Sequence, residues 1–185
     1  EETVQVVATR LPESPHEAPA SIEVLTGDDL RGLGATTLKD ALVLATGVAT
    51  APGGDGGPAG SVPEFWGLRE LDAFLLVVDG VPWGGAFNPA LTSLSLRDVE
   101  RIEVLRGPAP VTFGATSFVG VIHVVHQAAA ATRRYASVSA GSYGSGAGAG
   151  DLAIPSSGPW KSRLSLDGER QGFRDDRTSF ARGHA

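Results

Sequence analysis

The sequence predicts an α/β domain, a small mixed sheet with short helices, followed by the first antiparallel strands of a transmembrane β-barrel. Three observations lead to this prediction. Residues 98–125 hold two strand-like segments on either side of a loop punctuated by Gly and Pro. Residues 26–47 hold two short helical patterns, each preceded by a capping residue. From residue 134 onward, apolar and polar side chains alternate, as expected for strands between lipid and a wet lumen.

Composition narrows the classes of function. The chain has 185 residues, a formal net charge of −6 and neither Cys nor Met. The negative charge argues against a nucleic-acid partner held through its phosphates. The lack of Cys excludes a disulfide scaffold, a Cys-ligated zinc site and a lipid-modified N-terminal Cys. Without Met the chain is not an intact translation product, so we expect that a signal peptide has been removed. No apolar run reaches the roughly 18 residues that a membrane-spanning helix needs.

The N-terminal region is expected to be extended. Residues 1–10 (EETVQVVATR) alternate and are rich in β-branched side chains, which suits a segment that pairs with a sheet edge. Their terminal position alone would instead predict disorder. Residues 11–19 contain three prolines and predict a linker, and residues 21–25 (SIEVL) alternate and predict the first strand of the domain.

Two helices are predicted next, because Thr26 and Thr37 are each followed three residues later by an aspartate, which is the spacing of a capping box. Glycines end both segments, and the second ends at Gly47. Residues 51–60 are rich in Gly and Pro and predict a loop.

The remaining strands follow from apolar runs and turn signals. Residues 74–78 (FLLVV) predict a buried strand, and Asp79-Gly80 predicts a hairpin turn after it. Residues 102–106 alternate, and residues 119–125 form a β-branched run, so both predict strands. Further on, alternation predicts about three strands and the start of a fourth, with strands in the ranges 135–143, 146–154 and 161–170.

Several of these segments resemble, in the same order, the plug domain of TonB-dependent outer-membrane receptors. The run VERIEVLRGP…FGA…GVIHVV resembles the end of that domain, LTGDDLRGLGATTLKDALVLATGV resembles its opening helices, and LLVVDGVPW resembles its L-V-L-I-D-G-V-P segment. Some positions depart from the family pattern. His123 stands at a usual Asn, Phe113 at a usual Tyr, and Trp66 at the usual Arg before Gly67-Leu68, which argues against an ionic role for position 66.

The resemblance implies a domain organisation. It places a TonB-box-like segment at residues 1–10, a linker at 11–19, a plug domain at 20–127, a hinge at 128–133 and the first strands of a 22-stranded-type β-barrel at 134–185. An open sheet edge is not tolerated in lipid, so the rest of the barrel must complete these strands. We therefore expect either a fragment or one part of a split receptor.

The family also implies functional residues. The segment that would pair with TonB in the periplasm consists of Glu2, Thr3, Val4, Gln5 and Val6. A charged clamp between plug and barrel is expected at Glu100, Arg101, Glu103 and Arg106, for which the alternative is a solvated strand face. Aromatic residues in or beside loops are expected to face the ligand, with core packing as the alternative: Phe65, Trp66, Trp83 and Phe87.

Enzymatic and metal-binding roles find little support. No Ser/His/Asp set is recognisable from spacing, and the glycine-rich residues 144–150 do not follow a buried strand and open a helix, as a nucleotide loop would. His123 and His126 are three apart on a predicted strand, which places them on opposite faces. We expect no metal site, no cofactor and no enzymatic activity.

The predicted function is therefore that of the N-terminal part of a TonB-dependent transporter in the outer membrane of a Gram-negative bacterium. The plug and the N-terminus would face the periplasm, and the plug would gate the barrel until TonB pulls on it and admits a scarce ligand such as an iron-siderophore complex. The expected partners are TonB, the rest of the β-barrel in the same or a separate chain, outer-membrane lipid and a small-molecule ligand from outside. The alternative is a barrel-less periplasmic plug-like binding or adaptor module.

Overall fold

The computed structural model describes residues 21–50, 63–65, 67–68, 74–83, 94–107, 119–128, 134–154, 158–172 and 179–184. The chain divides into two compact units, Glu1–His126 and Gln127–Ala185, which are described separately below. The predicted N-terminal segment, linker and loop at 51–60 lie outside the described residues, as does most of the predicted hinge. Among the described residues, no helix is long and apolar enough to cross a membrane.

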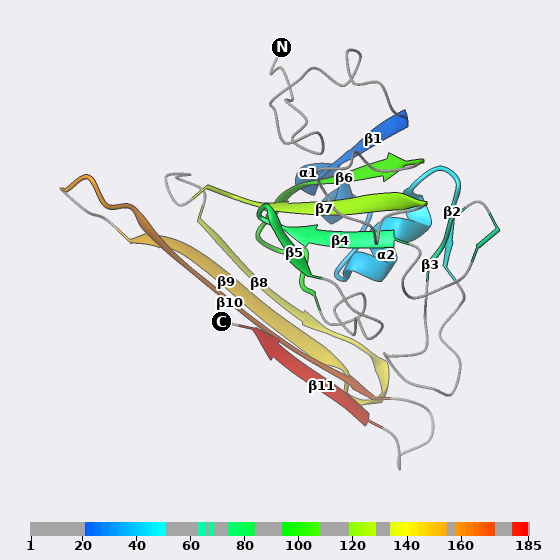
Figure 1. Cartoon of the computed structure of the whole chain (residues 1–185). Coiled ribbons are helices and arrows are strands. Elements are labelled where there is room, and N and C mark those ends of the chain that lie inside the picture. The colour runs from blue at the N-terminus through cyan, green and yellow to red at the C-terminus, as the bar shows by residue number, and fades with distance from the viewer. Residues whose placement is uncertain are drawn as a thin grey trace. The chain divides into compact units, whose positions relative to one another are not determined.

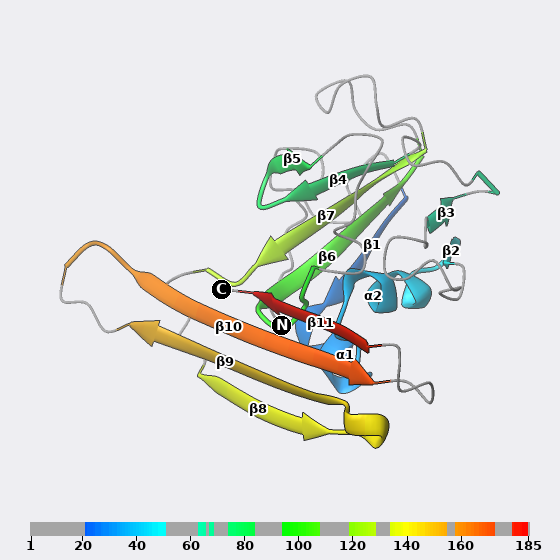
Figure 2. The same cartoon turned by 90° about the horizontal axis from the view of Figure 1, so that it is seen from below.

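The first unit is built on a five-stranded sheet in the order β1-β6-β7-β4-β5, whose strands Figure 2 shows side by side. Strand β4 runs parallel to β7, and the other neighbouring strands are antiparallel, so the sheet is mixed, as predicted. The strands have the following bounds: β1 Ser21–Thr26, β4 Phe74–Val78, β5 Val81–Trp83, β6 Val99–Arg106 and β7 Gly120–His126. A separate two-stranded sheet pairs β2 (Val48–Thr50) with β3 (Pro63–Phe65).

Two short helices, α1 (Gly27–Gly32) and α2 (Leu38–Leu44), connect β1 to β2 (Figure 1). Both predicted caps are confirmed. The side chain of Thr26 accepts a hydrogen bond from the Asp29 amide, and Thr37 and Asp40 form a complete capping box. These bonds satisfy backbone donors that a helix start would otherwise leave without partners.

Both faces of the five-stranded sheet carry buried apolar side chains. On the face that packs against the helices, strand residues such as Ile102, Ile122 and Leu76 form one core with Leu38 and Leu42. On the opposite face, a second cluster consists of Leu75, Val77, Leu105 and Val121. Burial on two sides explains why β4 is a continuous apolar run and does not alternate.

The second unit is a four-stranded antiparallel sheet in the order β11-β10-β9-β8. Its strands are β8 Tyr135–Ala140, β9 Gly146–Ile154, β10 Ser162–Gly172 and β11 Ser179–His184. The strand predicted at residues 135–143 is too long, because β8 ends at Ala140 and a 3-10 turn, Ser142–Gly144, reverses the chain. Tyr143 in this turn has a φ of 58°, which no strand residue adopts.

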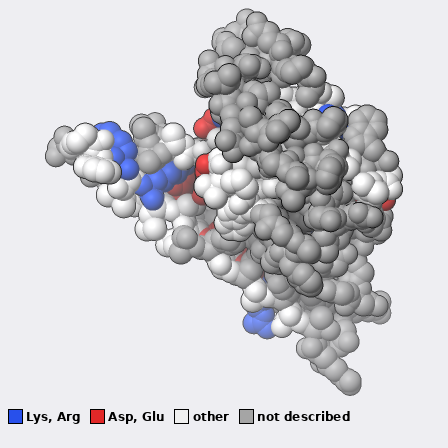
Figure 3. Space-filling model, viewed as in Figure 1, with Lys and Arg blue, Asp and Glu red and all other residues white. Residues whose placement is uncertain are grey.

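The register divides this second sheet into an apolar and a polar face. Leu164 is paired with Leu152, and Leu166 with Gly150, so that the two leucines of β10 project on the same side as Leu152. All three leucines are between 46% and 49% exposed. The intervening positions of β10 are polar: Arg163, Ser165, Asp167 and Glu169. Figure 3 shows that Lys and Arg side chains gather over the end of this sheet where β9 stops and β10 begins.

Candidate functional site

The charged residues of β6 form an ion-pair network around Arg101. The guanidinium contacts Glu100 Oε1 at 2.6 Å through Nη1 and Glu103 Oε1 at 2.8 Å through Nε. The Glu103 side chain is fully buried, whereas that of Glu100 is 48% exposed. Arg101 therefore connects a buried carboxylate to a carboxylate at the surface.

Glu103 continues the network to β7 and to the β4–β5 turn. Its Oε2 lies 3.3 Å from Nδ1 of His123, which is directly opposite it in the β6–β7 register. The amide of Gly80 donates to Nε2 of the same imidazole at 3.3 Å. Because an amide N–H can only donate, Nε2 must carry the lone pair, so the neutral His123 has its proton on Nδ1 and donates it to Glu103.

The surroundings of Glu103 act on its pKa in opposite directions. Burial by itself raises the pKa, since it disfavours the charged carboxylate. Hydrogen bonds from His123 and Arg101, together with positive charge nearby, outweigh burial and hold the pKa of Glu103 below its ordinary value. Glu103 is accordingly an ionised, buried group that depends on its partners.

Arg106, although only three positions beyond Glu103, belongs to a different network. Its Nη1 lies 2.7 Å from Glu23 Oε2, and it also donates to the Thr46 carbonyl and, over 3.3–3.4 Å, to the Ser21 hydroxyl. The four residues predicted as one clamp thus fall into two groups, Arg106 on one side and the Arg101 network on the other. The partners of both groups named here lie in the first unit.

A second histidine of β7 holds the same turn that His123 contacts. Asp79 Oδ1 accepts the His126 amide at 2.8 Å, and Asp79 Oδ2 lies 2.7 Å from His126 Nδ1. The imidazole Nε2 is 3.8 Å from Asp98 Oδ1. Sequence reasoning identified the Asp79-Gly80 turn but missed its attachment to β7. Within the described part of the chain, no group of three or more His, Cys, Asp or Glu residues is arranged to hold a metal ion.

Of the predicted ligand-facing aromatics, the structure places one side chain. Trp83 ends β5, an edge strand of the sheet, and is 49% exposed. Phe65 ends β3, but its side chain lies outside the described residues, as do Trp66 and Phe87. The predicted TonB-binding residues Glu2 to Val6 are likewise outside them. The sequence alone remains the basis for these assignments.

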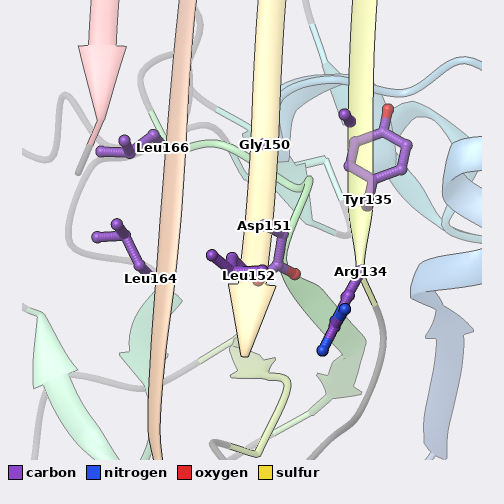
Figure 4. Close-up of a pocket in the computed structure, with 8 residues that line it drawn as sticks. Arg134, Tyr135, Gly150, Asp151, Leu152, Leu164 and Leu166 are labelled. Carbon is purple, nitrogen blue, oxygen red and sulfur yellow. The ribbon is translucent and has the colours of Figure 1, made fainter. Parts of the chain in front are cut away.

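An open, mainly apolar depression lies on the second unit. It is lined by residues of three adjacent strands, including Tyr135, Leu152, Leu164 and Leu166 (Figure 4). Arg134 and Asp151 also line it. This lining is that of an apolar sheet surface, and it offers no nucleophile paired with a base.

Comparison with known proteins identifies the family. Residues 14–121 match the TonB-dependent Receptor Plug Domain. The chain is 29% identical over 197 residues to the vitamin B12 transporter BtuB of Vibrio cholerae, covering 95% of this chain and 32% of that protein. It is 32% identical over 125 residues to BtuB of Vibrio vulnificus, covering 66% of this chain and 20% of the relative. The chain therefore spans about a third or less of the length of these relatives.

Solved structures share the fold. The ferripyoverdine receptor of the outer membrane of Pseudomonas aeruginosa matches 91% of this chain and 22% of its own, with a TM-score of 0.75 and 21% identity. The ferric yersiniabactin uptake receptor FyuA of Yersinia pestis matches 82% of this chain and 23% of its own, with a TM-score of 0.64 and 25% identity. A mixed α/β fold, capped helices at the expected places and a family match over more than half of the chain agree. The chain belongs to the TonB-dependent receptor plug family, whose members are non-enzymatic transporters.

Proposed function

We propose that the chain is the N-terminal part of a TonB-dependent transporter of a Gram-negative outer membrane, in which residues 20–127 form the plug that gates a β-barrel. The observation that carries the proposal is that one chain contains a sheet of the plug family and, after it in the sequence, a second sheet whose two faces differ in polarity. Relatives named as outer-membrane receptors support the same location. The plug and the N-terminus would face the periplasm.

Residues 134–185 are proposed as the first barrel strands, joined to the plug by a hinge at 128–133. One face of the second sheet exposes Leu152, Leu164 and Leu166, as lipid contact requires, and the other carries charged side chains, as a wet lumen allows. The outer strands β8 and β11 each have one described neighbour. Strand edges in a bilayer need partners, so the rest of the barrel, in this or another chain, would pair with them.

Energy would reach the plug through its N-terminal segment. Glu2, Thr3, Val4, Gln5 and Val6 are proposed to add as a strand to an edge of TonB, because an extended β-branched segment suits main-chain pairing. Deletion of residues 1–7 should abolish capture of TonB in a pull-down and leave ligand affinity unchanged. Capture at wild-type strength after the deletion would contradict this assignment.

The Arg101 network is proposed as the plug's share of a clamp to the barrel. Glu100 is the member that reaches the surface, with 48% of its side chain exposed, and it is the group that would meet a barrel cation. Glu103 supports the clamp from inside through Arg101. Arg106 would take part only if it released Glu23, because its guanidinium is already engaged within the plug.

The ligand is proposed to be a scarce metal chelate taken up from outside, such as an iron-siderophore complex. Relatives and structural neighbours are named for vitamin B12, ferripyoverdine and ferric yersiniabactin, all of which are large chelates. Trp83, with Phe65, Trp66 and Phe87, is proposed to face it. Replacing Trp83 with Ala should weaken ligand binding without loss of folded protein.

Fractionation distinguishes the transporter from a barrel-less periplasmic adaptor. A transporter component should be recovered in outer-membrane fractions and require detergent for extraction. Recovery in the periplasmic wash would instead support the adaptor and sink the transporter proposal.

A further inference from the structure

Strand β1 is the element through which the N-terminal segment joins the plug. It lies at the edge of the five-stranded sheet, where its described neighbour is β6. The register pairs Ser21 with Arg106 and Thr26 with Arg101, so the N-terminal end of β1 meets the C-terminal end of β6. Traction arriving from residues 1–20 reaches the β1–β6 pair at Ser21 and Arg106.

Side-chain burial holds β1 less firmly than it holds the inner strands. Ser21 is exposed, and the other five residues of β1 are only partly buried. By contrast, β4 is buried along its whole length, and β7 is buried over residues 120–124. Because burial of apolar surface is the main stabilising contribution of a strand, polar contacts can influence β1 more than they influence the inner strands β4 and β7.

A compact polar cluster sits at the loaded end of β1. Arg106 contacts Ser21 and, at 2.7 Å, Glu23, which are the first and third residues of the strand. Glu23 in turn accepts from the Thr46 amide at 2.9 Å and from the Thr46 hydroxyl at 3.2 Å. Arg106 also donates to the Thr46 carbonyl. Both backbone groups of Thr46, just beyond α2, are thereby bound to this pair.

The cluster is shielded from solvent, so its ion pair and hydrogen bonds can stabilise the attachment of β1. The side chains of Arg106 and Glu23 are 13% and 23% exposed, so their ion pair is less solvated than the fully exposed pairs that usually contribute little. Hydrogen bonds to charged partners are about twice as strong as those between neutral groups. Three elements, β1, β6 and the α2–β2 turn, are tied together at one point.

We propose that Glu23, Arg106 and Thr46 form a latch that sets the force at which traction on the N-terminus peels β1 from the plug. The proposal rests on the proposed function, in which TonB pulls on that segment. An antiparallel pair peeled from one end loads its terminal contacts first. Here those contacts coincide with the latch, so Glu23 and Arg106 must separate before the inner hydrogen bonds of β1 are loaded.

Two covalent handles test the latch without TonB. The chain has no Cys, so Thr3→Cys and Ala128→Cys introduce the only two thiols. DNA handles attached there to the full chain in detergent place the first unit in the load path and leave the second unit outside it. In optical tweezers, we expect Glu23→Gln and Arg106→Gln each to lower the force of the first unfolding event. The double variant should lower it little further, since both changes remove one interaction.

Matched variants give the controls. Glu64→Gln makes the same charge change on β3, outside the five-stranded sheet, and should leave the first force at its wild-type value. Arg106→Lys keeps the positive charge but loses some of the N–H donors of the guanidinium, so it should give an intermediate force. A wild-type first force in Glu23→Gln would overturn the proposal, and so would an equal loss of force in Glu64→Gln.

Hydrogen exchange supplies a second readout that a general loss of stability does not reproduce. In Glu23→Gln, we expect the amides of β1 to exchange about tenfold faster, while those of β4 and β7 keep their wild-type protection. Uniform acceleration across the sheet would show that Glu23 stabilises the whole unit and would refute a local latch. Because the covalent handles need no TonB, capture of TonB at wild-type strength after deletion of residues 1–7 would count against the proposed function alone.

Discussion

Glu103 and His123 face each other across the β6–β7 pair, with Oε2 of the carboxylate 3.3 Å from Nδ1 of the imidazole. The Gly80 amide occupies the other ring nitrogen. This arrangement fixes the tautomer, because the Nε2–H form would point its N–H at the Gly80 N–H and its Nδ1 lone pair at the carboxylate, and both contacts would be repulsive. Nitrogen NMR of the His123 side chain should show the Nδ1–H form at neutral pH, and an Nε2–H spectrum would contradict it.

Replacement of Glu103 by Gln should destabilise the first unit strongly. The variant leaves Arg101 with Glu100 alone and turns an amide NH₂ or carbonyl toward His123, which breaks a buried charged network. Loss of one partner of a buried ion pair typically costs about 3–5 kcal/mol. Urea unfolding should show a large fall in the free energy of unfolding. The exposed Glu100→Gln change should have a far smaller effect, about 1 kcal/mol or less.

Acid should weaken the first unit through Glu103 and Asp40. The pKa of Glu103 is lowered as described above. For Asp40, burial raises the pKa, but hydrogen bonds from Thr36 and Thr37 outweigh it and lower the pKa overall. A carboxyl whose pKa is lower when folded stabilises the fold above its unfolded pKa, and this contribution is lost as the pH falls through the folded pKa. Unfolding measured between pH 7 and 3 should show stability falling below about pH 4.5.

The double variant Glu103→Gln, Asp40→Asn provides the control for this pH dependence. It should be less stable at pH 7 and should lose less further stability on acidification, since two of the linked carboxylates are gone. A pH profile parallel to that of the wild type would show that other groups dominate.

Gly27 is required by the close approach of α1 to β6. A Cβ at this position would lie 2.0 Å from the Val99 carbonyl oxygen, a backbone atom that can move only if β6 moves. Gly27→Ala should therefore cost at least about 1–3 kcal/mol, the usual cost of overpacking. Gly32 is the matched control, since a Cβ there meets nothing within 4 Å. Gly32→Ala should leave thermal stability near the wild-type value.

Gly172 plays the same part in the second unit. A Cβ would lie 1.8 Å from the Tyr143 carbonyl oxygen, while the adjacent Ser145 hydroxyl accepts the Gly172 amide at 3.0 Å. Gly172→Ala should displace the Ser142–Gly144 turn and, under the proposed function, reduce the amount of protein assembled in outer membranes. Gly148→Ala should assemble normally, because its Cβ would sit 3.9 Å from the nearest atom, the Ser137 carbonyl oxygen. Equal assembly of both variants would remove this role for Gly172.

Local chemistry explains what could be predicted from the sequence. The Thr37–Asp40 capping box and the Asp79-Gly80 turn depend on neighbouring residues, and both are present. The end of β8 was misjudged because Tyr143 continues the alternation, although the glycines on either side of the turn favour reversal.

Long-range contacts explain what could not be predicted. Arg106 appeared to belong with Arg101 because the two are close in sequence, but its partners Glu23 and Thr46 lie 83 and 60 positions away. The attachment of His123 to Gly80 spans 43 positions. The sequence of β6 shows which of its residues are charged, but the elements that pack beside β6 decide which partners those residues contact.

The position of β1 at the edge of its sheet has a consequence for how the domain recovers after β1 is displaced. Removal of an edge strand breaks one row of main-chain hydrogen bonds. Strands β6, β7, β4 and β5 then remain paired with one another. The surviving strands keep the template against which β1 was aligned, with the position opposite Arg106 open again for Ser21. A displaced β1 can therefore return to its original register without the rest of the domain being rebuilt.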